Sequence, residues 1–239
     1  MKRIYSIFII VLICSLQGGC MYPKEKQMEN QLPYEEQIHS VQNAVDQFRK
    51  DEGGILPIET KDNNTPIYQK YVIKFSRISP RYIAEPPQNA FQSGGIFQYV
   101  LVGAEEKPTV KLLDVRMAQQ IQDFQLRLQV YQEKNKYPPF KEILADNVYT
   151  IDYEKMGLKQ PPTVKSPFSN QELSFVIDGQ GEIFVDYTPD LYDALKKNKK
   201  KVKPGEDIRN LLVEQSDFVP AFSLPYTVGK DGKPIFLSE

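Results

Sequence analysis

The sequence predicts an α+β protein with two similar halves, each an amphipathic helix packed on a small antiparallel sheet, followed by a C-terminal extension of helices and a hairpin. Two segments carry apolar residues at helical spacing, and short runs rich in β-branched and aromatic residues follow each of them. The 239 residues are 41% hydrophobic, which is enough to build a core. The 18 prolines divide the chain into short elements.

The first predicted helix follows Pro33 and ends at Gly53 and Gly54. Its apolar residues recur every three or four positions: Ile38, Val41, Val45 and Phe48. Because residues at this spacing share one face of a helix, they form a continuous apolar stripe. We expect this stripe to cover the sheet of the first half, residues 33–113.

The second predicted helix begins after Asp114, whose carboxylate can cap its first turn. It ends before the sequence Tyr137-Pro138-Pro139, because proline disfavours helical backbone in the residue before it. The apolar stripe of this helix consists of Met117, Ile121, Phe124, Leu128 and Tyr131. We interpret the stripe as core packing of the second half, residues 114–188, rather than as the lining of a ligand pocket.

The same order of features occurs twice along the chain. Each helix is followed by a predicted strand, a Pro-Pro pair and another predicted strand, at 71–75 and 95–102 in the first half and at 149–153 and 173–177 in the second. We interpret this order as an internal duplication. Chance similarity between short apolar strands is the alternative.

Leu128, Tyr131, Tyr137 and Pro138 form a helix-then-Tyr-Pro arrangement that precedes a predicted sheet. This arrangement resembles the soluble domains of type IV pilins and type II secretion pseudopilins. The resemblance implies a pilin-like fold for each half. The pilin peptidase site and its continuous hydrophobic helix are absent from the sequence, so assembly into a pilus is not implied.

Tight hairpins are predicted where Asp-Gly pairs separate apolar runs. Asp178-Gly179-Gln180-Gly181 divides the run 175–187, and Asp231-Gly232 divides the run 226–237. Between these hairpins, segments 189–199 and 204–214 have helical character. Residues 189–239 therefore make up the predicted C-terminal extension.

The N-terminus has the pattern of a secretory signal peptide, residues 1–19. Lys2 and Arg3 precede the apolar run 4–16, and Gly18 and Gly19 follow it. The apolar run is shorter than the roughly 20 residues that span a bilayer. A retained transmembrane anchor is therefore the less favoured alternative.

Gly18-Gly19-Cys20 resembles a bacterial lipobox, which predicts that Cys20 carries lipid. Gln17 departs from the pattern, because an aliphatic residue usually stands there and Leu16 lies one place earlier. An unmodified Cys20 beside an ordinary cleavage site is the alternative. Polar residues follow Cys20, so 20–32 is predicted to be a tether, and Cys14 is an apolar signal residue that is discarded.

Composition and motifs exclude several classes of site. The formal net charge is -1, so no nucleic-acid partner is expected, and Cys14 and Cys20 are the two cysteines, so the folded part has neither disulfide nor cysteine ligands. His39 is the single histidine, which argues against a multi-histidine metal site and against a serine hydrolase. No cofactor, metal or catalytic residue is therefore expected.

Two charged groups offer weaker alternatives. The carboxylates of Asp152, Asp178, Glu182 and Asp186 lie in one strand-rich region and could serve glycoside chemistry or a calcium loop, although we interpret them as turn-forming and outward-facing residues. The lysines between Lys196 and Lys203 could face anionic lipid or cell-wall polymers. A solvated helix end is the favoured interpretation of that run.

A second resemblance covers nearly the whole chain. It rests on Cys20-Met21-Tyr22-Pro23, Leu56-Pro57-Ile58-x-Thr60-Lys61, Thr65-Pro66-Ile67-Tyr68, Ala90-Phe91-x-Ser93-Gly94-Gly95, Phe175-Val176-Ile177-Asp178-Gly179-Gln180-Gly181-Glu182 and Phe218-Val219-Pro220-Ala221-Phe222-Ser223-Leu224-Pro225-Tyr226. These segments resemble the YphF lipoproteins of spore-forming Gram-positive bacteria. The resemblance implies a lipoprotein outside the cytoplasm and brings no activity or site residues with it.

These observations favour a non-enzymatic binding or scaffold protein of the cell envelope, held on the outer face of the membrane through lipid on Cys20. Its aromatic-rich sheets would offer surfaces to a protein partner. A small-ligand-binding lipoprotein associated with a transporter is one alternative. A cell-envelope enzyme that acts through carboxylates is the other.

Overall fold

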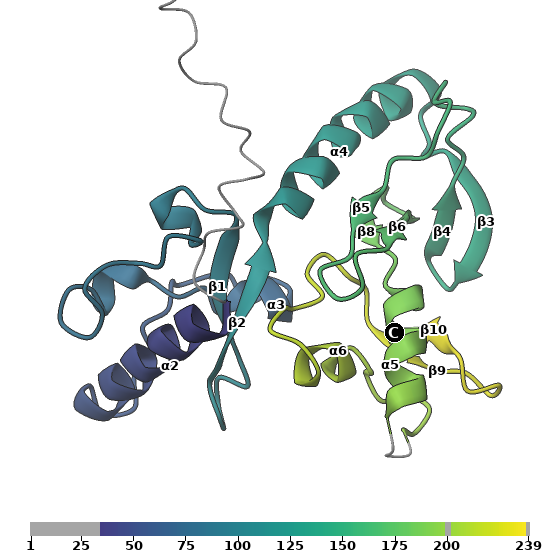
Figure 1. Ribbon diagram of the computed structural model, residues 1–239. Helices are drawn as coiled ribbons and strands as arrows, with labels where there is room; N and C mark the ends of the chain where they lie inside the picture. The colour runs from purple at the N-terminus through teal and green to yellow at the C-terminus, as the bar shows by residue number, and fades with distance from the viewer. Residues whose placement is uncertain (1–33, 199–201, 238–239) are drawn as a thin grey trace, which may run out of the picture. The chain divides into compact units, whose positions relative to one another are not determined.

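The computed structural model describes residues 34–198 and 202–237, and its helices and small antiparallel sheets confirm the predicted α+β class (Figure 1). The described residues from Glu35 onward form one compact unit. The predicted signal peptide, Cys20 and the tether 20–32 lie outside the described residues, as do residues 199–201 of the lysine run. The predicted boundaries of the halves, near residues 113 and 188, stay predictions.

Helix α2, Tyr34–Asp51, confirms the first predicted helix. Its buried apolar residues include the predicted stripe of Ile38, Val41, Val45 and Phe48. Gly53 follows the helix with a φ of 63°, a left-handed conformation that most L residues avoid. The helix therefore ends where the sequence predicts.

The first sheet is a two-stranded antiparallel pair of β1, Phe97–Val102, and β2, Thr109–Asp114. Short helical segments precede it: α3 (Ile67–Lys70), η2 (Phe75–Arg77) and η3 (Phe91–Ser93). Val72 pairs with Val100 through a single bridge, so the predicted strand 71–75 touches β1 without forming a ladder.

The predicted strand 71–75 is wrong at its C-terminal end, where Phe75 begins the 3₁₀ helix η2. Phe75 is buried and lies edge-on to Tyr99, with 5.6 Å between the ring centroids. The backbone N–H of Lys74 already donates to the Pro57 carbonyl, away from β1. Burial of the aromatic ring thus coincides with a turn of the backbone that ends the pairing with β1.

Helix α4, Val115–Asn135, confirms the second predicted helix and leads directly out of β2 (Figure 1). The Asp114 carboxylate accepts a hydrogen bond from the Arg116 backbone N–H at 3.0 Å, which is the predicted N-cap. Met117, Phe124 and Leu128 of the predicted stripe are buried, whereas Ile121 and Tyr131 are half-buried. Phe124 stacks on Phe175 at a centroid distance of 5.5 Å.

The largest sheet has four antiparallel strands in the order β3-β4-β7-β8. The strands are β3 (Phe140–Ala145), β4 (Val148–Ile151), β7 (Phe175–Asp178) and β8 (Ile183–Val185), and a separate pair is formed by β5 (Val164–Lys165) and β6 (Glu172–Leu173). The turn between β7 and β8 confirms the predicted Asp-Gly hairpin. Asp178 Oδ1 accepts the backbone N–H of Gln180 at 2.9 Å and of Glu182 at 2.8 Å, which fixes the turn.

The C-terminal extension contains α5 (Thr188–Lys197), α6 (Asn210–Glu214), β9 (Tyr226–Val228) and β10 (Pro234–Phe236). The antiparallel pair of β9 and β10 confirms the predicted terminal hairpin. The predicted helix 204–214 is too long, since Gly205 has a φ of 92° and α6 begins five positions later, at Asn210.

The extension also completes the first sheet. The Leu112 N–H donates to the Asp217 carbonyl at 2.8 Å, and the Val219 N–H donates to the Leu112 carbonyl at 3.0 Å. These bonds place residues 217–219 beside β2 like a third strand. A buried apolar cluster joins the two parts: Val72, Val100, Leu113, Val213, Val219 and Ala221. The first half therefore closes its core with residues from the C-terminal end of the chain.

Within the part of the chain that the structure describes, no helix combines the length and apolarity needed to cross a membrane.

Candidate binding pocket

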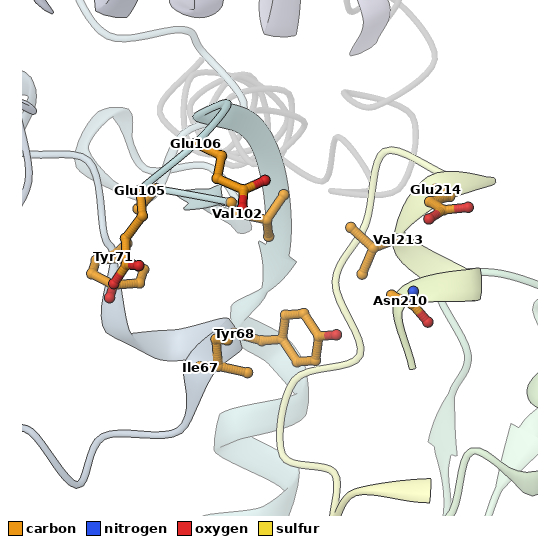
Figure 2. Close-up of a pocket in the computed structure, with 11 residues that line it drawn as sticks. Ile67, Tyr68, Tyr71, Val102, Glu105, Glu106, Asn210, Val213 and Glu214 are labelled. Carbon is orange, nitrogen blue, oxygen red and sulfur yellow. The ribbon is translucent and has the colours of Figure 1, made fainter. Parts of the chain in front are cut away.

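A pocket of about 670 Å³ opens between α3, the turn joining β1 to β2, and α6 (Figure 2). We call it the α3–α6 pocket. Its walls come from segments more than a hundred residues apart in the sequence. The attachment of residues 217–219 to β2 is what brings α6 to the first sheet. The pocket is therefore a product of the C-terminal extension folding back on the first half.

The inner surface of the α3–α6 pocket is largely apolar and aromatic. Tyr68 reaches from α3 toward α6, with Val102 and Val213 on either side of the space in front of it (Figure 2). Val213 is buried in the cluster that holds the extension to the first sheet. Ile67 lies beside Tyr68 at the edge of the pocket and is 57% exposed. The apolar part of a ligand could thus pack between Tyr68, Val102 and Val213.

Arg209 contacts the Tyr68 ring of the pocket. Its guanidinium lies 5.2 Å from the centroid of the Tyr68 ring, a cation–π distance. It also forms a bidentate ion pair with Asp207, at 2.6 Å and 2.9 Å, and donates to the Ser223 carbonyl at 2.9 Å. Asp207 therefore balances the positive charge of Arg209. Because Arg209 is 9% exposed, these contacts fix the position of α6.

The hydroxyl group of Tyr68 stays neutral at physiological pH. Burial raises the pKa of Tyr68 to about 12, because the phenolate would be desolvated, and the nearby Arg209 charge opposes part of that rise. A neutral phenol can both donate and accept a hydrogen bond. Tyr68 can therefore contact a charged ligand without losing its proton.

Three carboxylates form the rim of the pocket. Glu105 and Glu106 lie in the turn between β1 and β2, and Glu214 lies at the end of α6 (Figure 2). All three are exposed, and within the described part of the chain none of them forms an ion pair. Among the described residues that line the pocket, none carries a positive charge. The rim is therefore negative and free to meet a cation.

Gly103 shapes the turn that carries two of these carboxylates. Its φ is 61°, and a Cβ atom there would lie 3.0 Å from the Lys107 carbonyl oxygen. Glycine avoids both the backbone strain and the close contact. It therefore allows the chain to reverse tightly and to present Glu105 and Glu106 at the rim.

The carboxylates that the sequence offered for chemistry hold turns and a helix start or lie exposed beside them. Asp178 holds the β7–β8 turn, as described above, and Glu182 is exposed beside it. Asp186 Oδ1 accepts the Thr188 N–H at the start of α5 and the Tyr226 hydroxyl, at 2.9 Å and 3.0 Å. Each of these contacts fixes a turn or a helix start, as the sequence interpretation expects.

The remaining sequence candidates are Asp152, which is half-buried, and His39 and Lys196, which are exposed. Asp152 pairs with Lys155 at 3.0 Å, and this partner lowers the pKa of the Asp152 carboxyl. His39 is exposed on α2. Among the described residues, no group of three or more His, Cys, Asp or Glu side chains could hold a metal ion. Lys196 lies over the Tyr192 ring at 4.0 Å, near the C-terminal end of α5. None of them lines the α3–α6 pocket.

Sequence reasoning missed one buried acid, Asp190 in the first turn of α5. Its carboxylate accepts hydrogen bonds from the hydroxyl groups of Ser166 at 2.8 Å and Ser169 at 2.6 Å. Desolvation raises the pKa of Asp190, and the two serine hydrogen bonds counteract part of that rise. These bonds tie the loop after β5 to α5. The Ser-Pro-Phe-Ser sequence at 166–169 was the available signal.

Comparison with known proteins reaches the first half of the chain. No curated protein and no solved structure matches the chain. The resemblance of each half to pilin domains therefore stays a prediction. Two walls of the α3–α6 pocket, α3 and the β1–β2 turn, lie in the part that matches a family model, whereas α6 lies beyond it. That model is the YphF family N-terminal domain, which residues 34–114 match.

Proposed function

We propose that this protein is a lipoprotein outside the cytoplasm, held to the membrane by lipid on Cys20, that acts as a non-enzymatic binding protein in the cell envelope. The positive residues Lys2 and Arg3, the apolar run 4–16 and the lipobox-like Gly18-Gly19-Cys20 support the location. The match of residues 34–114 to the YphF family N-terminal domain is in keeping with the same proposal.

The α3–α6 pocket is the observation that carries the binding role. Its volume of about 670 Å³ lies in the range of ligand sites, and its apolar walls surround a few convergent polar groups. A partner segment that buries an apolar surface between Tyr68 and Val213 would gain affinity from that contact.

The lipid anchor can be tested by labelling intact cells with a clickable fatty acid. We expect the wild-type protein to take up the label and to sediment with membranes, because several buried acyl chains hold a protein stably. Cys20→Ala should lose both properties. Cys14→Ala is the matched control, since Cys14 lies in the apolar signal run and should leave labelling unchanged. Equal labelling of the Cys20→Ala protein would refute the anchor.

The partner can be sought by placing a photo-cross-linking amino acid at Ile67, which is 57% exposed at the edge of the pocket. We expect a discrete cross-linked band in intact cells. The same probe at Ile235, 47% exposed on β10 and outside the pocket, is the control and should not yield that band. Filling the pocket with Asn210→Trp should remove it. Identical bands from both probe sites would contradict a role for the pocket.

A small ligand is the second candidate, and the size of the pocket is the observation that favours it. In that case the purified full chain should bind the ligand without any second protein, and the Ile67 probe should capture no protein band. The two outcomes of the cross-linking experiment therefore separate a protein partner from a transported ligand.

A further inference from the structure

The charge on the rim of the α3–α6 pocket restricts what can bind there. Glu105, Glu106 and Glu214 line the pocket from two separate segments, the β1–β2 turn and α6, with Glu105 on the side near Tyr71 (Figure 2). No positive side chain lines the pocket among the described residues, and Arg209, which contacts the Tyr68 ring, is paired with Asp207. An anionic ligand would meet uncompensated repulsion, whereas a cation would find three carboxylates that lack an ion pair of their own.

The shape of the site adds a second requirement. A cation that met only the rim would gain little, because carboxylates as exposed as these form weak ion pairs. Behind the rim, Val102, Val213 and the Tyr68 ring present an apolar space (Figure 2). The site therefore fits a group that has an apolar stem and a cationic end. Lysine and arginine side chains have this form.

Tyr68 and Asn210 supply neutral polar groups between the apolar walls and the rim. The Tyr68 hydroxyl points toward α6, where Asn210 lies (Figure 2). The phenol oxygen and the Asn210 amide oxygen can both accept hydrogen bonds from an ammonium or guanidinium group. A cation could thus be held by neutral acceptors and neutralised by the carboxylates at the same time.

We infer that the α3–α6 pocket recognises a segment of a partner protein through a lysine or arginine side chain, whose stem packs between Tyr68 and Val213 and whose charge is balanced by the rim glutamates. This inference rests on the proposed binding function and names the chemistry of the partner. Ile67 gives the reason for a polypeptide, because it continues the apolar surface beyond the pocket to where flanking residues would lie.

The inference can be tested with the detergent-solubilised full chain and two blocked peptides, acetyl-Leu-Lys-Leu-amide and its norleucine analogue, which lacks only the charge. Methyl resonances of Val102 and Val213 report on the site. We expect the lysine peptide to shift both resonances and to bind more tightly than the norleucine peptide. Raising the salt concentration should weaken the lysine peptide selectively, because exposed charges are screened.

The double variant Glu106→Gln, Glu214→Gln should weaken binding of the lysine peptide about 3- to 10-fold, as expected for two exposed ion pairs. Glu133→Gln is the matched control, since Glu133 is exposed on α4 and outside the pocket, and it should leave the affinity unchanged. Circular dichroism would verify that the variants are folded.

Equal binding of the two peptides, or no binding of either, would overturn the inference. Tighter binding of spermidine than of the lysine peptide would also overturn it, because the pocket would then select a free polyamine. The cross-linking experiment at Ile67 in intact cells tests the proposed binding function separately. A cross-link without lysine selectivity would refute the partner chemistry and leave the binding role standing.

Discussion

Phe124→Ala is expected to lower the free energy of unfolding by about 3–5 kcal/mol, the usual cost of removing a buried aromatic side chain. Phe124 is 2% exposed, stacks on Phe175 and lies 5.9 Å from the Tyr153 ring, so its removal leaves a cavity between α4 and the four-stranded sheet. Chemical denaturation followed by circular dichroism measures the change.

Leu126→Ala is the matched control for that experiment. Leu126 is on the same helix and is 58% exposed, so we expect a change of no more than about 0.5 kcal/mol. A loss at Leu126 as large as the loss at Phe124 would contradict the packing of α4 described here. The pair therefore tests which face of the helix is buried, independently of helix propensity.

Gly95→Ala is expected to have the next largest effect. A Cβ atom at Gly95 would lie 2.2 Å from the carbonyl carbon and oxygen of Asn89, which are backbone atoms and cannot rotate away. Overpacking usually costs about 1–3 kcal/mol, and a backbone clash should reach the top of that range or exceed it. The change should appear in thermal unfolding, and the shift of Asn89 should also weaken its 2.7 Å hydrogen bond with the Tyr99 hydroxyl.

Gly94→Ala separates the clash from the loss of glycine's flexibility. Gly94 has a φ of 82°, but a Cβ atom there meets nothing within 4 Å. It should therefore cost about 1–2 kcal/mol for the left-handed backbone alone. A greater loss at Gly94 than at Gly95 would show that the approach of Asn89 to Gly95 is not as close as described.

The elements governed by local sequence could be predicted. The helix α4, the cap at Asp114 and the Asp178-Gly179 turn depend on residues within a few positions of one another, and the structure confirms all three, with Met117, Phe124 and Leu128 of the α4 stripe buried. The prediction of a strand through Phe75 was wrong, because Phe75 packs against Tyr99 in a tertiary contact that sequence periodicity does not encode.

The α3–α6 pocket could not be predicted for the same reason. Tyr68 and Arg209 are separated by most of the folded chain, and nothing near either residue indicates the other. The available signal was the segment 218–226, which is part of the family resemblance. Val219 and Ala221 of that segment pack against the first sheet, and Tyr226 is buried with the second sheet.

The pairing of residues 217–219 with β2 joins segments that are far apart in the sequence. The β1–β2 hairpin can form from local contacts, but it gains its third strand only through the long-range contact between Leu112 and Val219, and such contacts are slow to form in folding. A chain truncated before α6 would carry the family-matched region, residues 34–114, and yet lack one wall of the pocket. The family-matched region therefore supplies α3 and the β1–β2 turn, and the extension must dock on β2 before α6 can close the pocket.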